Sequence, residues 1–162
     1  MTRICLLIAM ATILSALETA IPNPMPWIRL GLANLATILA LKWWGIREAV
    51  LIVVLRVFIS SLILGRLFQI TFWLSFSGSI AACLGMWLIF RCFEKYFSLI
   101  GVSIFGAVCH NLTQITVAYF LFIRQPALFS LIPLLLVSSL LSGLVIGIVA
   151  HIVSMRRDIL AD

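Results

Sequence analysis

Residues 127–153 read ALFSLIPLLLVSSLLSGLVIGIVAHIV, a run without a single formally charged side chain. The hydrocarbon core of a bilayer is about 30 Å thick, and a helix needs about 20 mostly apolar residues to cross it. This run is long enough. Five further apolar stretches precede it, at about 4–21, 27–43, 46–65, 67–90 and 99–122. The sequence therefore predicts an all-α membrane protein, a bundle of six transmembrane helices in one domain over residues 1–162.

The composition excludes a water-soluble globule. Of the 162 residues, 64% are hydrophobic and 10% are charged, and the mean hydropathy is +1.27. Too little polar material remains to cover a surface in water. The net charge of +6 comes from basic residues scattered singly between apolar runs, so we interpret them as topology signals and expect no nucleic acid partner.

The second stretch, 27–43, is the weakest of the six. Its uncharged part, between Arg29 and Lys42, covers only residues 30–41. This stretch fits either a short, tilted span or a re-entrant element. If it does not cross the membrane, the number of spans is odd and the C-terminus lies on the opposite side. The first connection is clear, because Pro22, Pro24 and Pro26 cannot continue a helix.

Charge bias orients the chain. With six spans and cytoplasmic termini, seven basic residues lie inside: Arg3, Lys42, Arg47, Arg91, Lys95, Arg156 and Arg157. Three lie outside: Arg29, Arg66 and Arg124. The positive-inside rule then places both termini of this multi-pass protein on the cytoplasmic side of a bacterial-type inner membrane. We expect the first stretch to be kept as a helix, because Glu18 is wrong for a signal cleavage after Ala20.

Polar side chains inside the spans are the candidates for a site, since each costs free energy in hydrocarbon unless it faces a partner or a wet cavity. Arg56 lies near the middle of the third span. It can pair with Glu18 in the first helix, bind a ligand, or do both, and these alternatives stay open.

The fifth span carries the stretch Gly106-Ala-Val-Cys-His-Asn-Leu-Thr-Gln114. Helical spacing puts His110 and Gln114 on one stripe with small residues beside them, and Asn111 is adjacent. Glu18, Asn34 and Arg56 share their depth, between the middle of the membrane and its outer third. We predict that these six side chains line one outward-facing pocket for a small polar or anionic ligand.

The residues do not suit catalysis. The only Asp residues, Asp158 and Asp162, lie in the C-terminal tail. We see no catalytic triad, no metal-ligand spacing and no nucleotide-binding loop, so we predict a protein that is not an enzyme and has no cofactor or metal. A proton relay through His110 is disfavoured, because no acid accompanies it on its helix.

Small residues form two lanes on the first helix. One contains Ala11, Ser15 and Thr19, and the other Thr12, Ala16 and Ala20. Two adjacent lanes exceed what one neighbour needs, which suggests contact with a partner subunit through Ala16 and Ala20. On the last helix, Ser139, Gly143 and Gly147 form another such face, for which internal packing is favoured.

Three segments carry a resemblance to a known family: Leu30-Gly-Leu-Ala-Asn34, Leu55-Arg56-Val-Phe and the stretch ending in Gln114. With them the chain, from its first helix to Gly147, resembles the Gx transporter family, also called heptaprenyl diphosphate synthase component I. That family is similar to the six-helix S components of energy-coupling factor (ECF) transporters. In those, an Ala-x-x-x-Ala lane docks on a coupling subunit, and Ala16 and Ala20 have this spacing.

The resemblance implies a membrane component that captures a small ligand from outside and transports it, with energising subunits as partners in the bilayer. The alternative is a non-catalytic membrane subunit of an isoprenoid or a quinone- or flavin-linked redox complex. Prenyl transfer by the usual route needs Asp-rich motifs that hold magnesium ions, and this chain has none.

Overall fold

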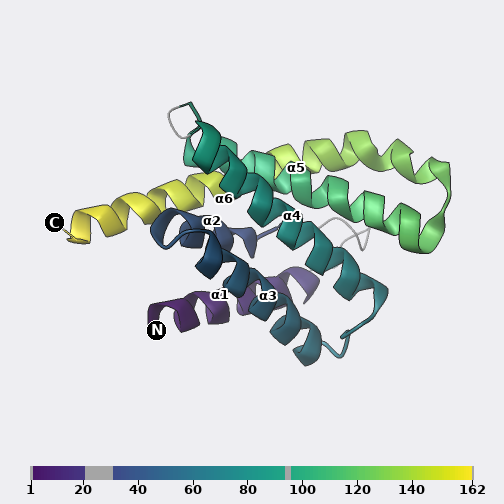
Figure 1. Cartoon of the computed structure of the whole chain (residues 1–162), viewed down its shortest axis with the longest axis horizontal. Helices are drawn as coiled ribbons and strands as arrows, with labels where there is room; N and C mark the ends of the chain where they lie inside the picture. Colours follow the sequence, from purple (N-terminus) through teal and green to yellow (C-terminus); the bar gives the residue numbers. More distant parts are fainter. Residues whose placement is uncertain (1, 21–30, 94–95, 162) are drawn as a thin grey trace.

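The computed structural model describes residues 2–20, 31–93 and 96–161, and all regular structure in these ranges is helical (Figure 1). The elements in chain order are α1 (Thr2–Ala20), α2 (Asn34–Trp43), α3 (Ile46–Ile63), α4 (Ile70–Phe93), α5 (Leu99–Ala118), the π-helical turn η1 (Tyr119–Ile123), the 3-10 helix η2 (Pro126–Leu131) and α6 (Ile132–Ala161).

Among the described residues, three stretches of helix are long and apolar enough to cross a bilayer. They are Ile70–Phe93, Leu99–Ile123 and Pro126–Arg156. The apolar part of α1, Ile4–Glu18, is shorter, and α3 includes Arg47, Glu48 and Arg56. The chain is therefore an all-helical membrane protein.

The surface of the molecule is unlike that of a protein that faces water. Large apolar side chains are exposed on the outside, for example Leu6, Leu62 and Leu141, each about two thirds exposed. Charged and polar side chains such as Arg56 and His110 are buried. Hydrocarbon around the bundle explains both observations, because it solvates leucine well and guanidinium poorly.

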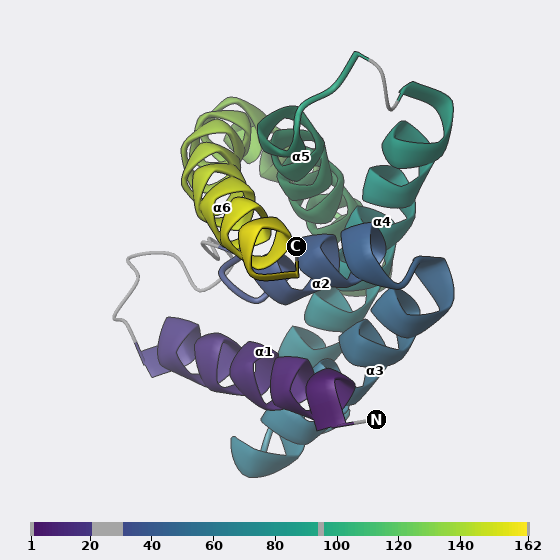
Figure 2. The same ribbon diagram turned by 90° about the vertical axis from the view of Figure 1, so that its left-hand side faces the viewer.

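Helix α2 occupies the centre of the molecule. It contacts each of the other five α-helices, and among those five the sequence of strong contacts is α1–α3–α4–α5–α6. Figure 2 shows the result, an arc of five helices with α2 inside it. Residues 36–41 are all buried, so no side of this segment is left for lipid.

The length of α2 bears on the expected span 27–43. Ten helical residues rise about 15 Å, half the thickness of a hydrocarbon core. Residues 27–30 lie outside the described ranges. What the structure shows of this segment is a short helix enclosed by protein.

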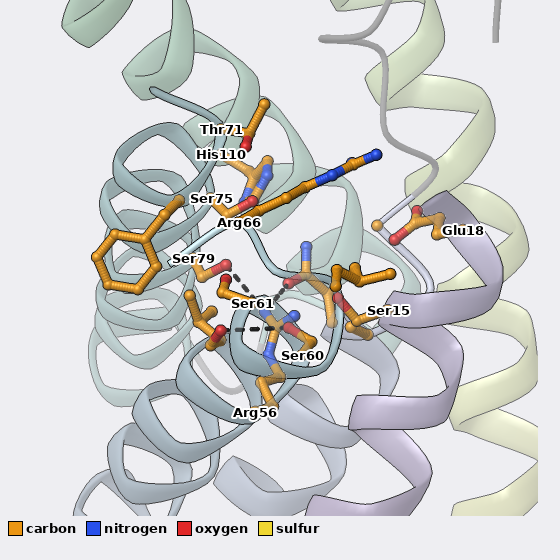
Figure 3. Close-up of a pocket in the computed structure, with 16 residues that line it drawn as sticks. Ser15, Glu18, Arg56, Ser60, Ser61, Arg66, Thr71, Ser75, Ser79 and His110 are labelled. Carbon is orange, nitrogen blue, oxygen red and sulfur yellow. Dashed lines mark hydrogen bonds between the residues drawn. The ribbon is translucent and has the colours of Figure 1, made fainter. Parts of the chain in front are cut away.

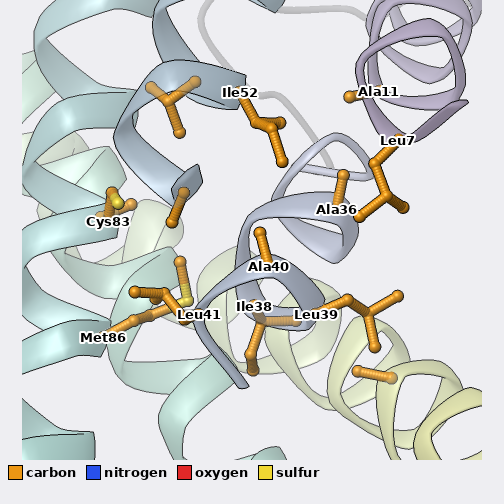
Figure 4. Packing of buried hydrophobic residues seen from close by; sticks show 14 of the residues in the cluster. Leu7, Ala11, Ala36, Ile38, Leu39, Ala40, Leu41, Ile52, Cys83 and Met86 are labelled. Atoms are coloured by element: carbon orange, nitrogen blue, oxygen red, sulfur yellow. The ribbon is translucent and has the colours of Figure 1, made fainter. Parts of the chain in front are cut away.

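The apolar core forms around α2 (Figure 4). Ile38 and Leu39 of α2 are almost completely buried, and they belong to one cluster with Ala11 of α1, Ile52 of α3 and Met86 of α4. The polar pocket described below begins at the N-terminal end of the same helix. The N-terminal end of α2 therefore lies at the polar pocket, and the rest of the helix lies in the apolar core.

Glycines let α5 and α6 pack with their backbones in contact. A Cβ added at Gly143 would lie 2.6 Å from Cα of Ile104, and one at Gly147 would lie 2.6 Å from Cα of Ile100. Both distances are far below van der Waals contact, so no side chain fits there. The small-residue face of the last helix is used inside the bundle, as the sequence favours.

Candidate ligand-binding site

Arg56 lies in the middle of α3 and is 4% exposed. Its Nη2 donates hydrogen bonds to Oδ1 of Asn34 at 3.2 Å and to Oγ of Ser79 at 3.0 Å. These bonds tie α3 to α2 and to α4. Because burying a charged group without hydrogen bonds costs several kcal/mol, they also make this position tolerable for an arginine.

A pocket opens beside Arg56 (Figure 3). Its walls come from α1, the turn before α2, α3, α4 and α5. The polar lining residues are Ser15, Glu18, Asn34, Arg56, Ser60, Ser61, Arg66, Thr71, Ser75, Ser79 and His110. The pocket therefore brings together Glu18, Asn34, Arg56 and His110, four of the six side chains for which the sequence predicts a shared site.

The pocket is narrow inside and open at one side. The space between its walls is about 520 Å³ when the open part is included, and the enclosed part has room for roughly two water molecules. A compact polar group fits there, and any larger part of a ligand would occupy the open side.

Hydroxyl groups make up most of the polar lining, and the sequence analysis did not single them out. A hydroxyl in a helix can bond to a carbonyl of its own helix, as Ser60 does to Val57 at 3.2 Å, so serine is too common in membrane helices to stand out. The available signal is spacing. Thr71, Ser75 and Ser79 recur every fourth residue, which places them on one stripe of α4.

Among these hydroxyl groups, that of Thr71 bears most directly on whether the pocket binds a ligand. Its Oγ1 is buried and has no hydrogen-bond partner within the described part of the chain. A buried polar atom without a partner carries a free-energy cost that a bound molecule can remove. Thr71 lines the pocket, where such a molecule would lie.

Glu18 anchors the turn that leads into α2. It is 6% exposed, and its Oε1 accepts a hydrogen bond from the backbone N–H of Leu32 at 3.1 Å. Asn34 lies two residues after Leu32, and its Oδ1 accepts a hydrogen bond from Arg56. Glu18 therefore holds in place the segment that positions Asn34, a structural role that the sequence did not predict.

His110 reaches the pocket from α5 because α4 has no side chain in its way. A Cβ on Gly78 would lie 3.1 Å from Nδ1 of His110 and 2.9 Å from Cγ of Gln114. His110 itself is 6% exposed. The glycine at position 78 is what lets the His110 and Gln114 side chains lie against the backbone of α4.

Asn111 and Gln114 lie elsewhere. Both line a second, mostly apolar pocket, with Leu74 of α4 and Leu135 of α6 in its walls. Nδ2 of Asn111 donates to Oγ of Ser139 at 2.7 Å and, at 3.5 Å, to the carbonyl of Leu135. The structure thus shows Asn111 joining α5 to α6, and neither residue lines the pocket beside Arg56.

The expected partner lane on α1 is partly turned inward. Ala11, Thr12 and Ser15 are buried, and α1 packs on α3. Ala16 is half-buried, whereas the side chain of Ala20 lies outside the described residues. Contact of Ala16 and Ala20 with a partner subunit stays a prediction.

The charged side chains that line the pocket leave an excess of positive charge. Two arginines and a histidine face one glutamate, and hydroxyl groups can donate to oxygen atoms of a ligand. Within the described ranges, no three His, Cys, Asp or Glu side chains lie close enough to hold a metal ion. What this arrangement can do is hold and orient a small acceptor-rich group.

No curated protein and no solved structure matches the chain. One family model does, and it covers residues 7–153, which include every residue that lines the pocket. Its description is heptaprenyl diphosphate synthase component I. The chain belongs to this family.

Proposed function

We propose that this protein is the substrate-binding component of a membrane transporter, of the kind that the resemblance to the Gx transporter family and to ECF S components implies. It captures a small polar or anionic ligand in the pocket beside Arg56. The observation that carries the proposal is the buried guanidinium of Arg56, held by Asn34 and Ser79 at the wall of a pocket lined with hydroxyl groups. A purely structural arginine needs no such pocket.

The position of the pocket supports capture from outside. Helix α1 begins, and α6 ends, on the left in Figure 1, and that end carries Lys42, Arg47, Arg91 and Arg156. The pocket lies toward the other end, where α3 ends and α4 begins. Since cytoplasmic ends of membrane proteins are enriched in Lys and Arg, the pocket faces outward in this proposal.

The test is native mass spectrometry of the protein gently extracted from its own membranes. We expect a bound small molecule on the native protein and none on Arg56→Ala. Arg56→Lys keeps the charge but not the planar fork of donors, so a reduced occupancy is expected.

Arg124→Ala is the matched control. Arg124 is an exposed arginine toward the same end of the bundle that does not line the pocket, so its removal should leave the ligand in place. Circular dichroism and gel filtration show whether each variant is folded. Ligand retained by folded Arg56→Ala would contradict the proposal.

The family description favours a second candidate function, since a component I is by its name one part of a synthase. In this alternative the protein is a non-catalytic membrane subunit of an isoprenoid or redox complex, and Arg56 and His110 only hold helices together. The same spectra distinguish the two. A synthase or redox subunit without a small molecule favours the alternative, and a small molecule together with energising subunits favours transport.

A further inference from the structure

A second arginine lies at the open side of the pocket. Helix α3 ends at Ile63, and Gly65 follows with φ +63°. The N–H of Gly65 bonds to the carbonyl of Leu62 at 3.1 Å, and the N–H of Arg66 to that of Ser61 at 2.8 Å. This pair of bonds is a Schellman motif, which fixes the backbone of Arg66 relative to α3.

The side chain of Arg66 has no structural task within the described part of the chain. Its guanidinium makes no hydrogen bond or ion pair there, although the residue is half-buried and lines the pocket. Figure 3 shows it extended from beside Ser75 toward the side on which Glu18 lies. An arginine that is fixed at its backbone and unused at its tip is available to a ligand.

The charges that line the pocket do not balance. Arg56 and Arg66 provide two positive charges and Glu18 provides one negative charge. Glu18 is already engaged with the N–H of Leu32. In a poorly solvated site such an excess of positive charge attracts an anion more strongly than it would in water.

The size of the pocket adds a constraint. The group that reaches Arg56 must be compact, because the enclosed part of the pocket has room for roughly two water molecules. A carboxylate or a phosphate is compact, accepts several hydrogen bonds, and matches the donor geometry of a guanidinium. A neutral polar group would leave the charge of Arg66 unused.

We infer that the ligand carries an oxyanion group of the carboxylate or phosphate type, which meets Arg66 first and is then held beside Arg56. This inference rests on the proposed function and assigns a role to Arg66. The oxyanion can belong to a free solute or to the headgroup of a lipid. Arg66 makes the site selective for anions.

The experiment uses the full chain in nanodiscs of phosphatidylcholine, with inorganic phosphate and succinate as probes in isothermal titration calorimetry. The native protein should bind at least one of them, and the affinity should fall as salt is added. In Arg66→Gln the affinity should be roughly tenfold lower, which is the effect of losing one hydrogen-bonded charge. Arg66→Lys should lie between the two.

Arg124→Gln removes an exposed positive charge from the same end of the bundle without touching the pocket, so its affinity should equal that of the native protein. Equal losses in Arg66→Gln and Arg124→Gln would overturn the inference, since a general surface charge would then explain them. Arg66→Gln breaks no hydrogen bond or ion pair in the described part of the chain, and Arg124 is exposed, so both variants should fold.

A second arm identifies the source of the oxyanion. In nanodiscs that also contain phosphatidic acid, native mass spectrometry should show retained phosphatidic acid, lost in Arg66→Gln, if a lipid headgroup is the ligand. If the protein retains a free carboxylate or phosphate and no phosphatidic acid, the inference holds and the ligand is a free solute. If Arg56→Ala releases a neutral molecule and neither probe binds, the inference fails while the proposed function stands. If no molecule is found and no probe binds, both fail.

Discussion

The guanidinium of Arg56 depends on two small acceptors, the amide oxygen of Asn34 and the hydroxyl of Ser79. Each comes from a different helix, so the arginine couples the geometry of the pocket to the packing of α2, α3 and α4. A change in either acceptor therefore affects both the stability of the protein and the shape of the pocket.

Ser79→Ala tests this coupling. The substitution removes one acceptor from a buried charged group, and we expect the free energy of unfolding to fall by about 1–3 kcal/mol. Reversible unfolding in mixed micelles measures it. The control is Ser77→Ala, because Ser77 bonds to the carbonyl of Trp73 in its own helix and its loss should change little. Equal effects of the two substitutions would mean that Ser79 does not support Arg56.

The sequence predicts part of the site at the level of residues. Arg56 stands out because a charge in an apolar span needs a reason, and the depth of Glu18, Asn34 and His110 along their helices suggests that they meet it. That they bind a ligand stays a prediction. Depth does not say toward which neighbour a side chain turns, and Asn111 turns to Ser139 of α6. The role that we propose for Arg66 depends on a turn whose geometry only the structure gives.

At the scale of helices, the contact between α5 and α6 depends on the absence of side chains at two positions. Gly143→Ala places a Cβ about where the backbone of Ile104 runs, so the helices must move apart. We expect a loss of about 1–3 kcal/mol, typical of overpacking, and a lower thermal midpoint in detergent. Leu144→Ala, on the exposed face of the same helix, should lower the midpoint much less. Similar midpoints for both would show that the two backbones tolerate separation.

The sequence does not predict all of the helices equally well. Apolar stretches locate α3, α4 and α5 within a few residues, because the length needed to cross a bilayer is a strong constraint, whereas α6 (Ile132–Ala161) continues past the expected end at residue 153. The stretch 27–43 is different, since apolar composition is equally required of a helix that faces lipid and of one that is enclosed by protein. The ten-residue α2 is of the second kind. Only the contacts with the five surrounding helices reveal it.

At the scale of the whole molecule, the two ends of the bundle should face opposite sides of the membrane. Cys5 and Cys92 are exposed toward the basic end, and Gln125 is exposed toward the other. In intact cells a membrane-impermeant maleimide should label Gln125→Cys in a protein that also carries Cys5→Ser and Cys92→Ser. The native protein should react only after the cells are permeabilised.

The double variant Cys5→Ser, Cys92→Ser controls for Cys83 and Cys109, which are buried and half-buried in the bundle. Labelling of the native protein from outside would reverse the orientation and place the pocket on the cytoplasmic side.

The enclosed position of α2 has a consequence for biogenesis. A segment of ten helical residues is too short to be inserted stably as a separate span. Residues 36–41 of this helix are all buried, so every side of it contacts protein. The longer helices that enclose it can enter the bilayer one after another as the chain is synthesised, whereas α2 gains its environment only from them. We therefore expect α2 to be enclosed only after its neighbours have been inserted, and because Asn34 is the first residue of that helix and lines the pocket, the pocket should take its final form at that late step.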